Sequence, residues 1–462
     1  MVVGEVADRA EAVVVGGGPG GYEAALQLAK HGKRVVLIER EAIGGVCLNV
    51  GCIPSKALIH QADIAHSSVS ESATGVVVSV DLDPPQMLQH RERVVAGLTE
   101  GVRRLLSDAG VERWAGSARF ARADRLVVEH SGNVRHLEFE NCVLAVGGRP
   151  IVLPGFEPGR SGEVEVLDST GALALDRIPE SMVVIGGGYI GVELGTAFAK
   201  LGSGVTIVEM AGSLLPGMDP ALGRVVARRL AGLGVRVELN SRALGLTNEG
   251  VTLAGGDGEV ALSVDCAIVA VGRKPNTDQL NLAAAGLETA AAGLIAVGPD
   301  RKAAPRIYAV GDITDGPALA HKATAEAQVV ADAIAGLPAA FDPACIPEVV
   351  FSDPEVASVG LSPAAAKEID PGSRSARIPF SANGRAQTLA NASGFAQLVV
   401  DGAGTVVGAQ LAGPTVSELV GELGFAIEMA ATATDLASTI HPHPTLSEAL
   451  MEAAKALSGP PT

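Results

Sequence analysis

Aromatic residues and cysteines are scarce in this chain of 462 residues. Only 3% of the residues are aromatic and five are cysteines, whereas 47% are hydrophobic. A supply of mostly aliphatic residues is typical of α/β layers, in which helices pack closely on sheets. The chain is too long for one hydrophobic core, so we expect two to four domains. The small, odd number of cysteines argues against a disulfide framework and fits a reducing compartment, so we expect a cytoplasmic location.

Positive charge is also in short supply. The 35 Lys and Arg residues are outnumbered by 52 Asp and Glu residues, which gives a formal net charge of −17. This balance argues against a nucleic-acid partner and favours a partner with a basic patch. Runs of 18 consecutive apolar residues are absent from the sequence, so we expect no membrane insertion. The acidic first residues, 1–8, argue against a secretory signal.

The first chemical motif is a dinucleotide-binding fingerprint. The apolar run 12–15 predicts a buried parallel strand, 22–31 a helix, and 35–38 a second strand that ends at Glu39. The turn glycines between the first strand and the helix are Gly16, Gly18 and Gly21. Such glycines let the backbone approach a pyrophosphate closely, and the terminal acid accepts hydrogen bonds from ribose hydroxyls.

The same unit recurs 170 residues later. Strands are predicted over 182–185 and 205–208, with a helix between them that runs to about Lys200. The glycines are Gly186, Gly188 and Gly191, and the acid is Glu209. Lys and Arg are absent from the sequence after Glu209 until Arg224, which favours NAD over NADP. Two fingerprints with matched acids predict two nucleotide cofactors.

Two further segments share a form. Residues 143–150 and 268–275 each read as an apolar strand ending at Gly, followed by a basic residue and Pro. Their recurrence after each fingerprint favours a crossover that returns to the cofactor over an ordinary strand and turn.

Residues 346–462 have a different sequence pattern from the two nucleotide-binding segments. Alternating segments at 395–400 and 406–411 predict an antiparallel sheet, which helices at about 415–431 and 446–457 flank.

A pair of cysteines follows the first fingerprint. Cys47 and Cys52 lie on a helix predicted to open near Gly51–Pro54, whose dipole, together with Lys56, would lower a thiolate pKa. A structural disulfide or half a zinc site is the alternative, but no further zinc ligands follow at close spacing, so no metal site is expected. A thiol pair and a nicotinamide each exchange two electrons, and a flavin is the natural relay between them. The remaining cysteines, interpreted as buried small hydrophobic residues, are Cys142, Cys266 and Cys345.

The C-terminal part supplies a candidate base. His443 lies between two prolines, and Glu448 follows five residues later. A carboxylate that orients the imidazole would make His443 a general base for a thiol. His441 has no such partner in the sequence and is interpreted as structural.

These segments together resemble the flavin-dependent pyridine nucleotide–disulfide oxidoreductases, and within that family the enzymes that oxidise dihydrolipoamide. The resemblance covers about residues 11–458 and is most specific at 47–56 and 443–448. It implies an α/β fold with two Rossmann-like dinucleotide-binding domains, for FAD and NAD, and an α+β C-terminal dimerisation domain. The implied domains are an FAD domain at 1–150, an NAD domain at 151–275, a central domain at 276–345 and an interface domain at 346–462.

The resemblance also assigns cofactor contacts. Lys56 would lie near the flavin ring, paired with Glu193, and Tyr189 would cover the nicotinamide pocket. The implied FAD residues are Gly16, Gly18, Gly21, Glu39, Lys56, Gly116, Asp312 and Ala320. The implied NAD residues are Gly186, Gly188, Tyr189, Gly191, Glu209 and Gly272. The sequence departs from the family pattern at Val46, where Thr is usual, and at 324–327, which lacks the usual acidic run ending in Gly.

The implied reaction is the oxidation of protein-bound dihydrolipoamide by NAD⁺ through a Cys47–Cys52 disulfide. Cys47 would meet the substrate and Cys52 would lie against the flavin. His443 and Glu448 would come from the other subunit of a homodimer, with a cis bond between His443 and Pro444. The implied partners are a lipoyl domain and the acyltransferase core of a 2-oxoacid dehydrogenase complex. Two alternatives stay open: an NAD(P)H-dependent reductase of another disulfide, such as a low-molecular-weight thiol, and a mainly structural role in such a complex.

Overall fold

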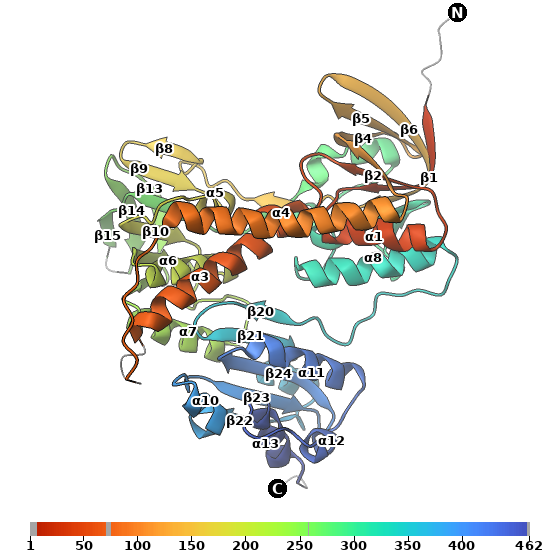
Figure 1. The fold of residues 1–462 in the computed structure, drawn as a ribbon. Coiled ribbons are helices and arrows are strands. Elements are labelled where there is room, and N and C mark those ends of the chain that lie inside the picture. Colours follow the sequence, from red (N-terminus) through yellow and green to blue (C-terminus); the bar gives the residue numbers. More distant parts are fainter. Residues whose placement is uncertain (1–6, 71–74, 257, 460–462) are drawn as a thin grey trace, which may run out of the picture. The chain divides into compact units, whose positions relative to one another are not determined.

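The computed structural model describes residues 7–70, 75–256 and 258–459. The chain divides into two compact units, and it passes between them several times. The first unit comprises residues 1–57, 86–151 and 272–342, and the second comprises 58–85, 152–271 and 343–462. Among the described residues, no helix is long and apolar enough to cross a membrane. Figure 1 shows the fold and labels many of the helices and strands.

A mainly parallel sheet forms the core of the first unit. Its main path runs in the order β18-β19-β6-β1-β2-β3. These strands are β1 (Asp8–Val15), β2 (Val35–Glu39), β3 (Glu112–Ala115), β6 (Asn133–Leu144), β18 (Lys302–Ala304) and β19 (Ile307–Ala309). β4 (Ser117–Arg122) and β5 (Arg125–His130) continue from β6 as an antiparallel meander. Val13 and Val14 are both fully buried although their side chains point to opposite faces, so helices and loops cover both faces of β1.

Helices cover one face of this sheet. α1 (Pro19–Lys30) and α8 (Ala320–Ile334) lie side by side (Figure 1), and their alanines and leucines pack with Val14 and Leu37 in one core. α4 (Pro84–Asp108) adds Leu106 to the same core. α2 (Gly45–Val50) and the start of α3 (Cys52–Ser70) carry the cysteine pair. The helix predicted over 22–31 corresponds to α1, which begins three residues earlier, at Pro19. Proline is favoured in the first turn of a helix.

The second unit contains another parallel sheet. The order is β12-β11-β10-β16-β9-β8, in which β8 alone runs antiparallel to its neighbour. The strands are β8 (Gly159–Ser161), β9 (Val164–Leu167), β10 (Ser181–Ile185), β11 (Gly204–Val208), β12 (Arg236–Glu238) and β16 (Cys266–Val269). The helices of this part are α5 (Ser169–Leu173), α6 (Tyr189–Lys200) and α7 (Pro220–Gly232). A three-stranded antiparallel sheet is made by β13 (Arg242–Leu246), β14 (Gly250–Gly255) and β15 (Gly258–Ser263).

The C-terminal part of the second unit is an antiparallel sheet with helices. The strand order is β20-β21-β24-β23-β22. The strands are β20 (Glu348–Val350), β21 (Glu355–Gly360), β22 (Arg374–Pro379), β23 (Phe395–Val400) and β24 (Val406–Gly413). The helices are α9 (Pro363–Ile369), α10 (Gly384–Thr388), α11 (Val416–Glu428), α12 (Ala433–Ser438) and α13 (Glu448–Leu457). The sheet and two helices predicted here are confirmed, whereas α9, α10 and α12 were not predicted.

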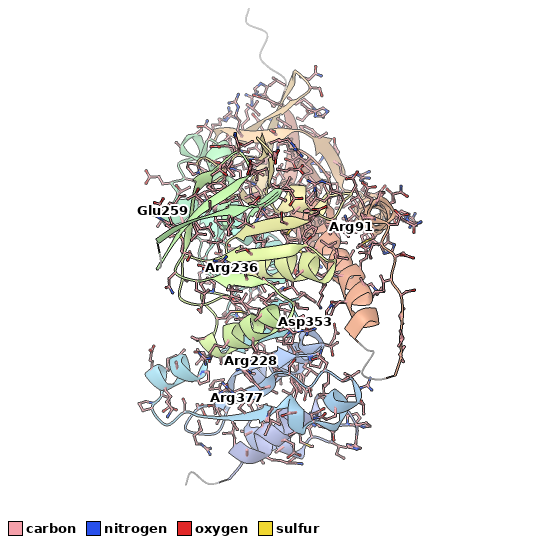
Figure 2. The ribbon with its side chains drawn as sticks, turned by 90° about the vertical axis from the view of Figure 1, so that its left-hand side faces the viewer. Arg91, Arg228, Arg236, Glu259, Asp353 and Arg377 are labelled. Atoms are coloured by element: carbon pink, nitrogen blue, oxygen red, sulfur yellow. The ribbon has the colours of Figure 1, made fainter. Side chains whose placement is uncertain are left out.

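One ionic cluster ties elements of the second unit together. Asp353, which Figure 2 labels, lies 2.8 Å from the ammonium of Lys200 at the end of α6 and 2.9 Å from the guanidinium of Arg229 on α7. Lys200 also pairs with Asp63 of α3 at 2.6 Å. The side chains of Lys200 and Asp353 are only 8% and 12% exposed, so water screens the Lys200–Asp353 attraction weakly.

The predictions for the lone cysteines were correct at two of three positions. Cys142 and Cys266 are fully buried in strands, and burial raises the pKa of the Cys266 thiol to about 12. Cys345 is only partly buried, because it lies in a loop against the carbonyl of Gly424 rather than in a sheet. The prediction that Cys345 is a buried residue was therefore wrong.

Candidate active site and cofactor sites

The cysteine pair lies where two helices meet. α2 carries Cys47 and ends at Val50, and α3 begins at Cys52. A Cβ at Gly51, between the helices, would lie 2.9 Å from the carbonyl oxygen of Val46, so a glycine permits this break. The prediction that one helix opening near Gly51–Pro54 carries both cysteines was therefore wrong for Cys47.

Cys47 and Cys52 are not joined by a disulfide bond, and their side chains are in hydrogen-bond contact. This contact, followed by burial, raises the pKa of the Cys47 thiol well above its ordinary value, and the positive charge of Lys56 opposes the rise. The expected lowering of the pKa was wrong for Cys47, because a neighbouring sulfur and partial burial outweigh the lysine. Cys47 is half-buried, whereas Cys52 is exposed.

The first fingerprint has the shape that a pyrophosphate requires. A Cβ at Gly21 would lie 1.8 Å from the carbonyl oxygen of Gly16, so only glycine lets α1 pack this closely on the turn. A Cβ at Gly18 would have its nearest neighbour 3.9 Å away, at Gly45. Among the described residues no side chain caps α1, so the N-terminus of this helix is available to a ligand. Backbone N–H groups at a helix N-terminus bind phosphates readily, and the turn therefore fits FAD.

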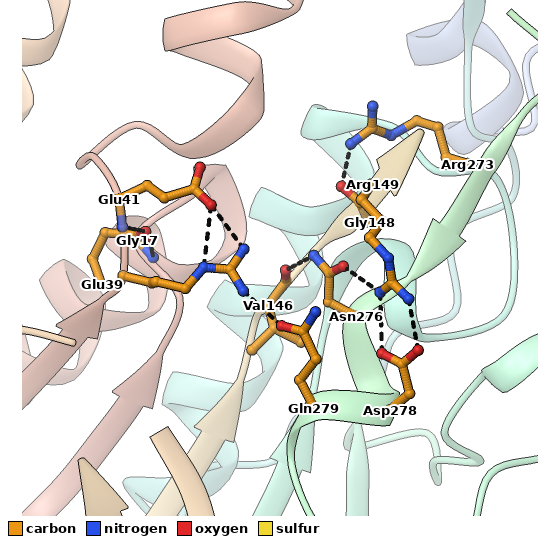
Figure 3. A network of polar contacts seen from close by, with 11 residues as sticks. Gly17, Glu39, Glu41, Val146, Gly148, Arg149, Arg273, Asn276, Asp278 and Gln279 are labelled. Atoms are coloured by element: carbon orange, nitrogen blue, oxygen red, sulfur yellow. Dashed lines mark hydrogen bonds and ion pairs between the residues drawn. The ribbon is translucent and has the colours of Figure 1, made fainter. Parts of the chain in front are cut away.

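Glu39 occupies the position expected of a ribose-binding acid. One carboxylate oxygen accepts the backbone N–H of Gly17 at 2.6 Å, and the other accepts that of Glu41 at 2.7 Å (Figure 3). A pocket beside Glu39 is lined by Gly116, a residue predicted from the sequence to contact FAD, and also by Asn276 and Gln279. The last two were not predicted, although the Pro-Asn sequence after the second strand–turn segment marks a turn at this point.

The two strand–turn segments of similar form pair with each other. β7 (Gly148–Pro150) and β17 (Arg273–Pro275) form a two-stranded antiparallel ribbon in the first unit. Arg149 from β7 binds the carboxylate of Asp278 through two nitrogens, at 2.6 and 3.0 Å, and the amide oxygen of Asn276 at 2.9 Å (Figure 3). The Asn276 amide in turn donates to the carbonyl of Val146 at 2.9 Å. This network fixes Asn276 at the pocket that contains Glu39.

Asp312 lies in a short 3-10 turn that precedes α8. Burial raises the pKa of its carboxyl, an effect that the positive charges of Arg273 and Lys322 oppose. Arg273 lies 4.0 Å from Asp312 and also donates to the carbonyl of Gly148. Ala320, the other predicted contact in this region, is the first residue of α8.

The second fingerprint repeats the first. Glu209 accepts the backbone N–H groups of Gly187 and Ala211, each at 2.7 Å. A Cβ at Gly191 would lie 1.9 Å from the carbonyl oxygen of Gly186, whereas a Cβ at Gly188 would meet no described atom within 4 Å.

The NAD-side turn leaves its N-terminus available in the same way. α6 has no side-chain cap among the described residues, and its first residue is the half-exposed Tyr189. This geometry fits the pyrophosphate of NAD. Gly272, the remaining predicted NAD residue, belongs to the first unit, where its carbonyl accepts the N–H of Ile151 at 3.1 Å.

The imidazole and carboxylate of the candidate base lie together. Nδ1 of His443 is 2.9 Å from an oxygen of Glu448, and the His443 side chain is 79% exposed. The other oxygen of Glu448 accepts the backbone N–H of Thr445 at 2.9 Å, and these two bonds lower the pKa of the Glu448 carboxyl. The His443–Pro444 bond is cis, as expected. Asn383 donates to the carbonyl of Thr445, which is a contact that the sequence did not predict.

Two further predictions concern the partners of His441 and Glu193. His441 was expected to have no carboxylate partner, but its Nε2 lies 2.9 Å from Glu422 of α11, and its side chain is buried. This contact agrees with a structural role. Glu193 is buried and accepts the backbone N–H of Phe351 at 3.0 Å within the second unit. Lys56 belongs to the first unit, so its pairing with Glu193 stays a prediction.

The comparisons with known proteins agree with this geometry. Residues 10–327 match the family described as pyridine nucleotide-disulphide oxidoreductase, and residues 346–454 match the dimerisation domain of the same family. The chain therefore belongs to the pyridine nucleotide-disulphide oxidoreductase family. It is a flavoprotein oxidoreductase that uses FAD and NAD, with the two Rossmann-like sheets and C-terminal dimerisation domain that the sequence predicted.

Individual relatives make the resemblance more specific. A protein named dihydrolipoyl dehydrogenase from Geobacillus stearothermophilus is 45% identical over 468 residues, which cover 100% of this chain and 99% of the relative. A protein of the same name from Halobacterium salinarum is 45% identical and covers 98% of both chains. The crystal structure of LpdA from Mycobacterium tuberculosis has a TM-score of 0.89 at 27% identity and covers 98% of this chain and 100% of that one. The predicted resemblance to dihydrolipoamide-oxidising enzymes is thus confirmed, and the match at 346–454 supports the predicted homodimer.

Proposed function

We propose that this chain oxidises dihydrolipoamide carried on a protein, with NAD⁺ as the electron acceptor. The observation that carries this proposal is the full-length likeness, at 45% identity, to relatives named dihydrolipoyl dehydrogenase. The contact between Cys47 and Cys52 supports it, because a dithiol substrate exchanges with a disulfide formed by two such neighbouring sulfurs. Bound FAD would supply the two-electron chemistry that reoxidises the cysteine pair and reduces NAD⁺.

The residues of the chain perform the thiol exchange. Because Glu448 holds Nδ1 of His443, Nε2 is left to accept a proton from the first substrate thiol. The substrate thiolate attacks the Cys47 sulfur of a Cys47–Cys52 disulfide, a mixed disulfide forms, and Cys52 leaves as a thiolate. The second substrate thiolate then attacks the substrate sulfur of the mixed disulfide. This step releases cyclic lipoamide and leaves Cys47 as a thiol after it takes up a proton.

The homodimer would complete each site, with His443 and Glu448 supplied by the subunit opposite the cysteine pair. We also propose that each chain has four domains: an FAD domain at residues 1–150, an NAD domain at 151–275, a central domain at 276–345 and an interface domain at 346–462. The NAD preference rests on Glu209, whose carboxylate is held by two backbone N–H groups and would repel a 2′-phosphate.

The biological partners follow from the same reaction. We place the chain in the cytoplasm, as part of a 2-oxoacid dehydrogenase complex, where a lipoyl domain delivers the dithiol. The net charge of −17 would attract a basic patch on the acyltransferase core. Such binding should weaken as salt is raised.

An anaerobic titration tests the function. Addition of dihydrolipoamide to the purified protein should change the visible flavin spectrum, and NAD⁺ should reverse the change and release NADH. A bound flavin that reacts with NADH but ignores dihydrolipoamide would instead favour a reductase of another disulfide. Tight binding to an acyltransferase core with negligible turnover would favour a structural role.

A further inference from the structure

Two charged side chains of α8 hold both sides of one glycine in the first unit. Glu326 accepts the backbone N–H of Gly311 at 2.6 Å, and the ammonium of Lys322 donates to the Gly311 carbonyl at 3.1 Å. Both side chains are almost completely inaccessible, at 0% and 1% exposure. Gly311 has a φ of +80°, so its backbone conformation is one that other residues rarely adopt.

The same pair also holds the far end of this turn. The hydroxyl of Thr314 donates to Glu326 at 3.0 Å and lies 3.0 Å from the Lys322 ammonium. Arg301 donates to Oε1 of Glu326, the same oxygen that lies near the Lys322 ammonium, so two cations share one buried carboxylate. Between Gly311 and Thr314 lies Asp312, the residue predicted to bind FAD.

Burying charges is costly, and a buried ion pair often stabilises a fold no more than apolar residues would. The hydrogen bonds of this pair are concentrated on one short turn, Gly311–Ile313, and on Thr314 beside it. Such a turn is held in one conformation only if its N–H and carbonyl groups have fixed partners. The Asp312 carboxylate is thereby kept beside Arg273, 4.0 Å away, and the backbone of Gly148.

We propose that Lys322 and Glu326 are positioning residues for the cofactor, which fix the turn Gly311–Ile313 so that Asp312 meets the ribityl or phosphate region of FAD. This inference rests on the proposed function, because it takes Asp312 as an FAD contact. Neither Lys322 nor Glu326 needs to touch the cofactor, and each acts through the backbone of the turn.

Substitution of Glu326 by Gln tests the carboxylate. The amide retains one acceptor for the N–H of Gly311 but presents an NH₂ group toward Arg301 or Lys322, so the turn loses its fixed position. We expect the dissociation constant of FAD, measured by flavin fluorescence on rebinding to the apoprotein, to rise at least tenfold. Gln328→Ala is the matched control, because Gln328 lies on the same helix and binds Asp332 instead. It should bind FAD as the wild type does.

Two variants at Thr314, which leave both buried charges in place, test the positioning role if Glu326→Gln does not fold. Thr314→Val keeps the side-chain volume but removes the hydroxyl that joins Glu326 and Lys322, whereas Thr314→Ser retains that hydroxyl. We expect at least fivefold weaker FAD binding for Thr314→Val and nearly wild-type binding for Thr314→Ser. Circular dichroism of each apoprotein and the dissociation constant of NADH, whose main fingerprint lies in the second unit, should be unchanged for both.

Two results would separate this inference from the proposed function. Folded variants Glu326→Gln and Thr314→Val that bind FAD within twofold of the wild type would overturn the positioning role alone. A wild-type apoprotein that does not bind FAD would overturn the proposed function and this inference with it.

Discussion

The carboxylate of Glu209 accepts the backbone N–H of Gly187 at 2.7 Å, and this bond spans the turn between the second strand and the first glycines of the second fingerprint. Glu39 and Gly17 form the same bond at 2.6 Å in the first fingerprint. Each acid is therefore fixed by its own turn, with its remaining acceptor capacity available to a ribose. The acid and the glycines of each fingerprint act as one preformed unit.

Glu209→Gln should weaken NAD binding. A neutral amide has one oxygen, which cannot accept from Gly187, Ala211 and a ribose hydroxyl as the two carboxylate oxygens can. The loss of a charged hydrogen bond costs about 1.5–3 kcal/mol, which corresponds to a rise of roughly 10- to 150-fold in the dissociation constant. Isothermal titration with NAD⁺ measures this change. The FAD content of the protein should stay the same, and a fall in FAD content without a change in NAD⁺ affinity would contradict the assignment.

Cys52→Ala should make Cys47 ionise at lower pH. The contact with Cys52 is the largest cause of the raised Cys47 pKa, and burial is the second. Its removal leaves burial opposed by Lys56, so the alkylation of Cys47 by iodoacetamide should reach its midpoint at lower pH than in the reduced wild type. Mass spectrometry of the tryptic peptides follows each thiol separately. Cys266, buried with a pKa of about 12, is the internal control and should react slowly in both proteins.

Glu448→Gln should lower kcat for dihydrolipoamide by about 10²-fold or more, the range typical of general acid–base groups. Glu448 orients His443 through Nδ1, and the pKa of its carboxyl is lowered by the Thr445 backbone N–H and by His443. An amide at this position can accept from Nδ1–H but can also present NH₂ and reverse the tautomer. Reduction of ferricyanide by NADH requires no proton transfer from a substrate thiol, so it should be unaffected. An equal loss of both activities would indicate a structural role for Glu448 instead.

Asp353→Asn should destabilise the second unit. Burial alone would raise the pKa of Asp353, but Lys200 and Arg229 outweigh it and hold the pKa below its ordinary value. A carboxyl with a lowered folded-state pKa contributes stability above its unfolded pKa, about 3.9, and this contribution is lost as the pH falls through the folded value. At pH 7 the variant should lose about 3 kcal/mol, because Asp63 is then the one carboxylate among the described residues that still pairs with Lys200. Urea unfolding at pH 7 and in steps below pH 4 measures the loss.

The pH dependence supplies the control for this prediction. The wild type and Asp353→Asn should converge in stability at the lowest pH, where the wild-type carboxyl is also protonated. Asp63→Asn, which affects the more exposed partner of Lys200, should cost less at pH 7. A constant difference between wild type and Asp353→Asn at every pH would contradict the electrostatic explanation.

The sequence predicted features that depend on neighbours along the chain. The glycines and acids of both fingerprints act within one βαβ unit, and His443 and Glu448 lie five residues apart, so their spacing was informative. Contacts between distant segments had no such signal. The hydrogen bond of Arg40 to Gln279, at 2.6 Å, joins two lining residues of the pocket beside Glu39 that are 239 positions apart in the chain.

The break between α2 and α3 was missed for a different reason. Gly51 could be read either as a residue at the start of one helix or as a break between two, and local propensity does not separate these cases. The two helices are separated where Gly51 packs closely against Val46, and this packing is not visible in the local sequence. The same limitation explains Cys345, whose apolar neighbours in the sequence did not show that its loop is partly exposed.

Gly188→Ala should block NAD without unfolding the protein. The φ of Gly188 is −71°, within a few degrees of the −73° of Gly18 in the first fingerprint, and such a value is ordinary for alanine. A Cβ at Gly188 would meet no described atom within 4 Å. The only space that the new methyl group fills is the space in front of α6, where the pyrophosphate would lie. We expect an unchanged melting temperature for the apoprotein and a loss of NAD⁺ affinity of at least tenfold. Gly191→Ala is the contrasting variant, because its Cβ would lie 1.9 Å from the carbonyl oxygen of Gly186 and should lower the melting temperature. A Gly188→Ala protein that binds NAD⁺ normally would show that the pyrophosphate does not approach this turn.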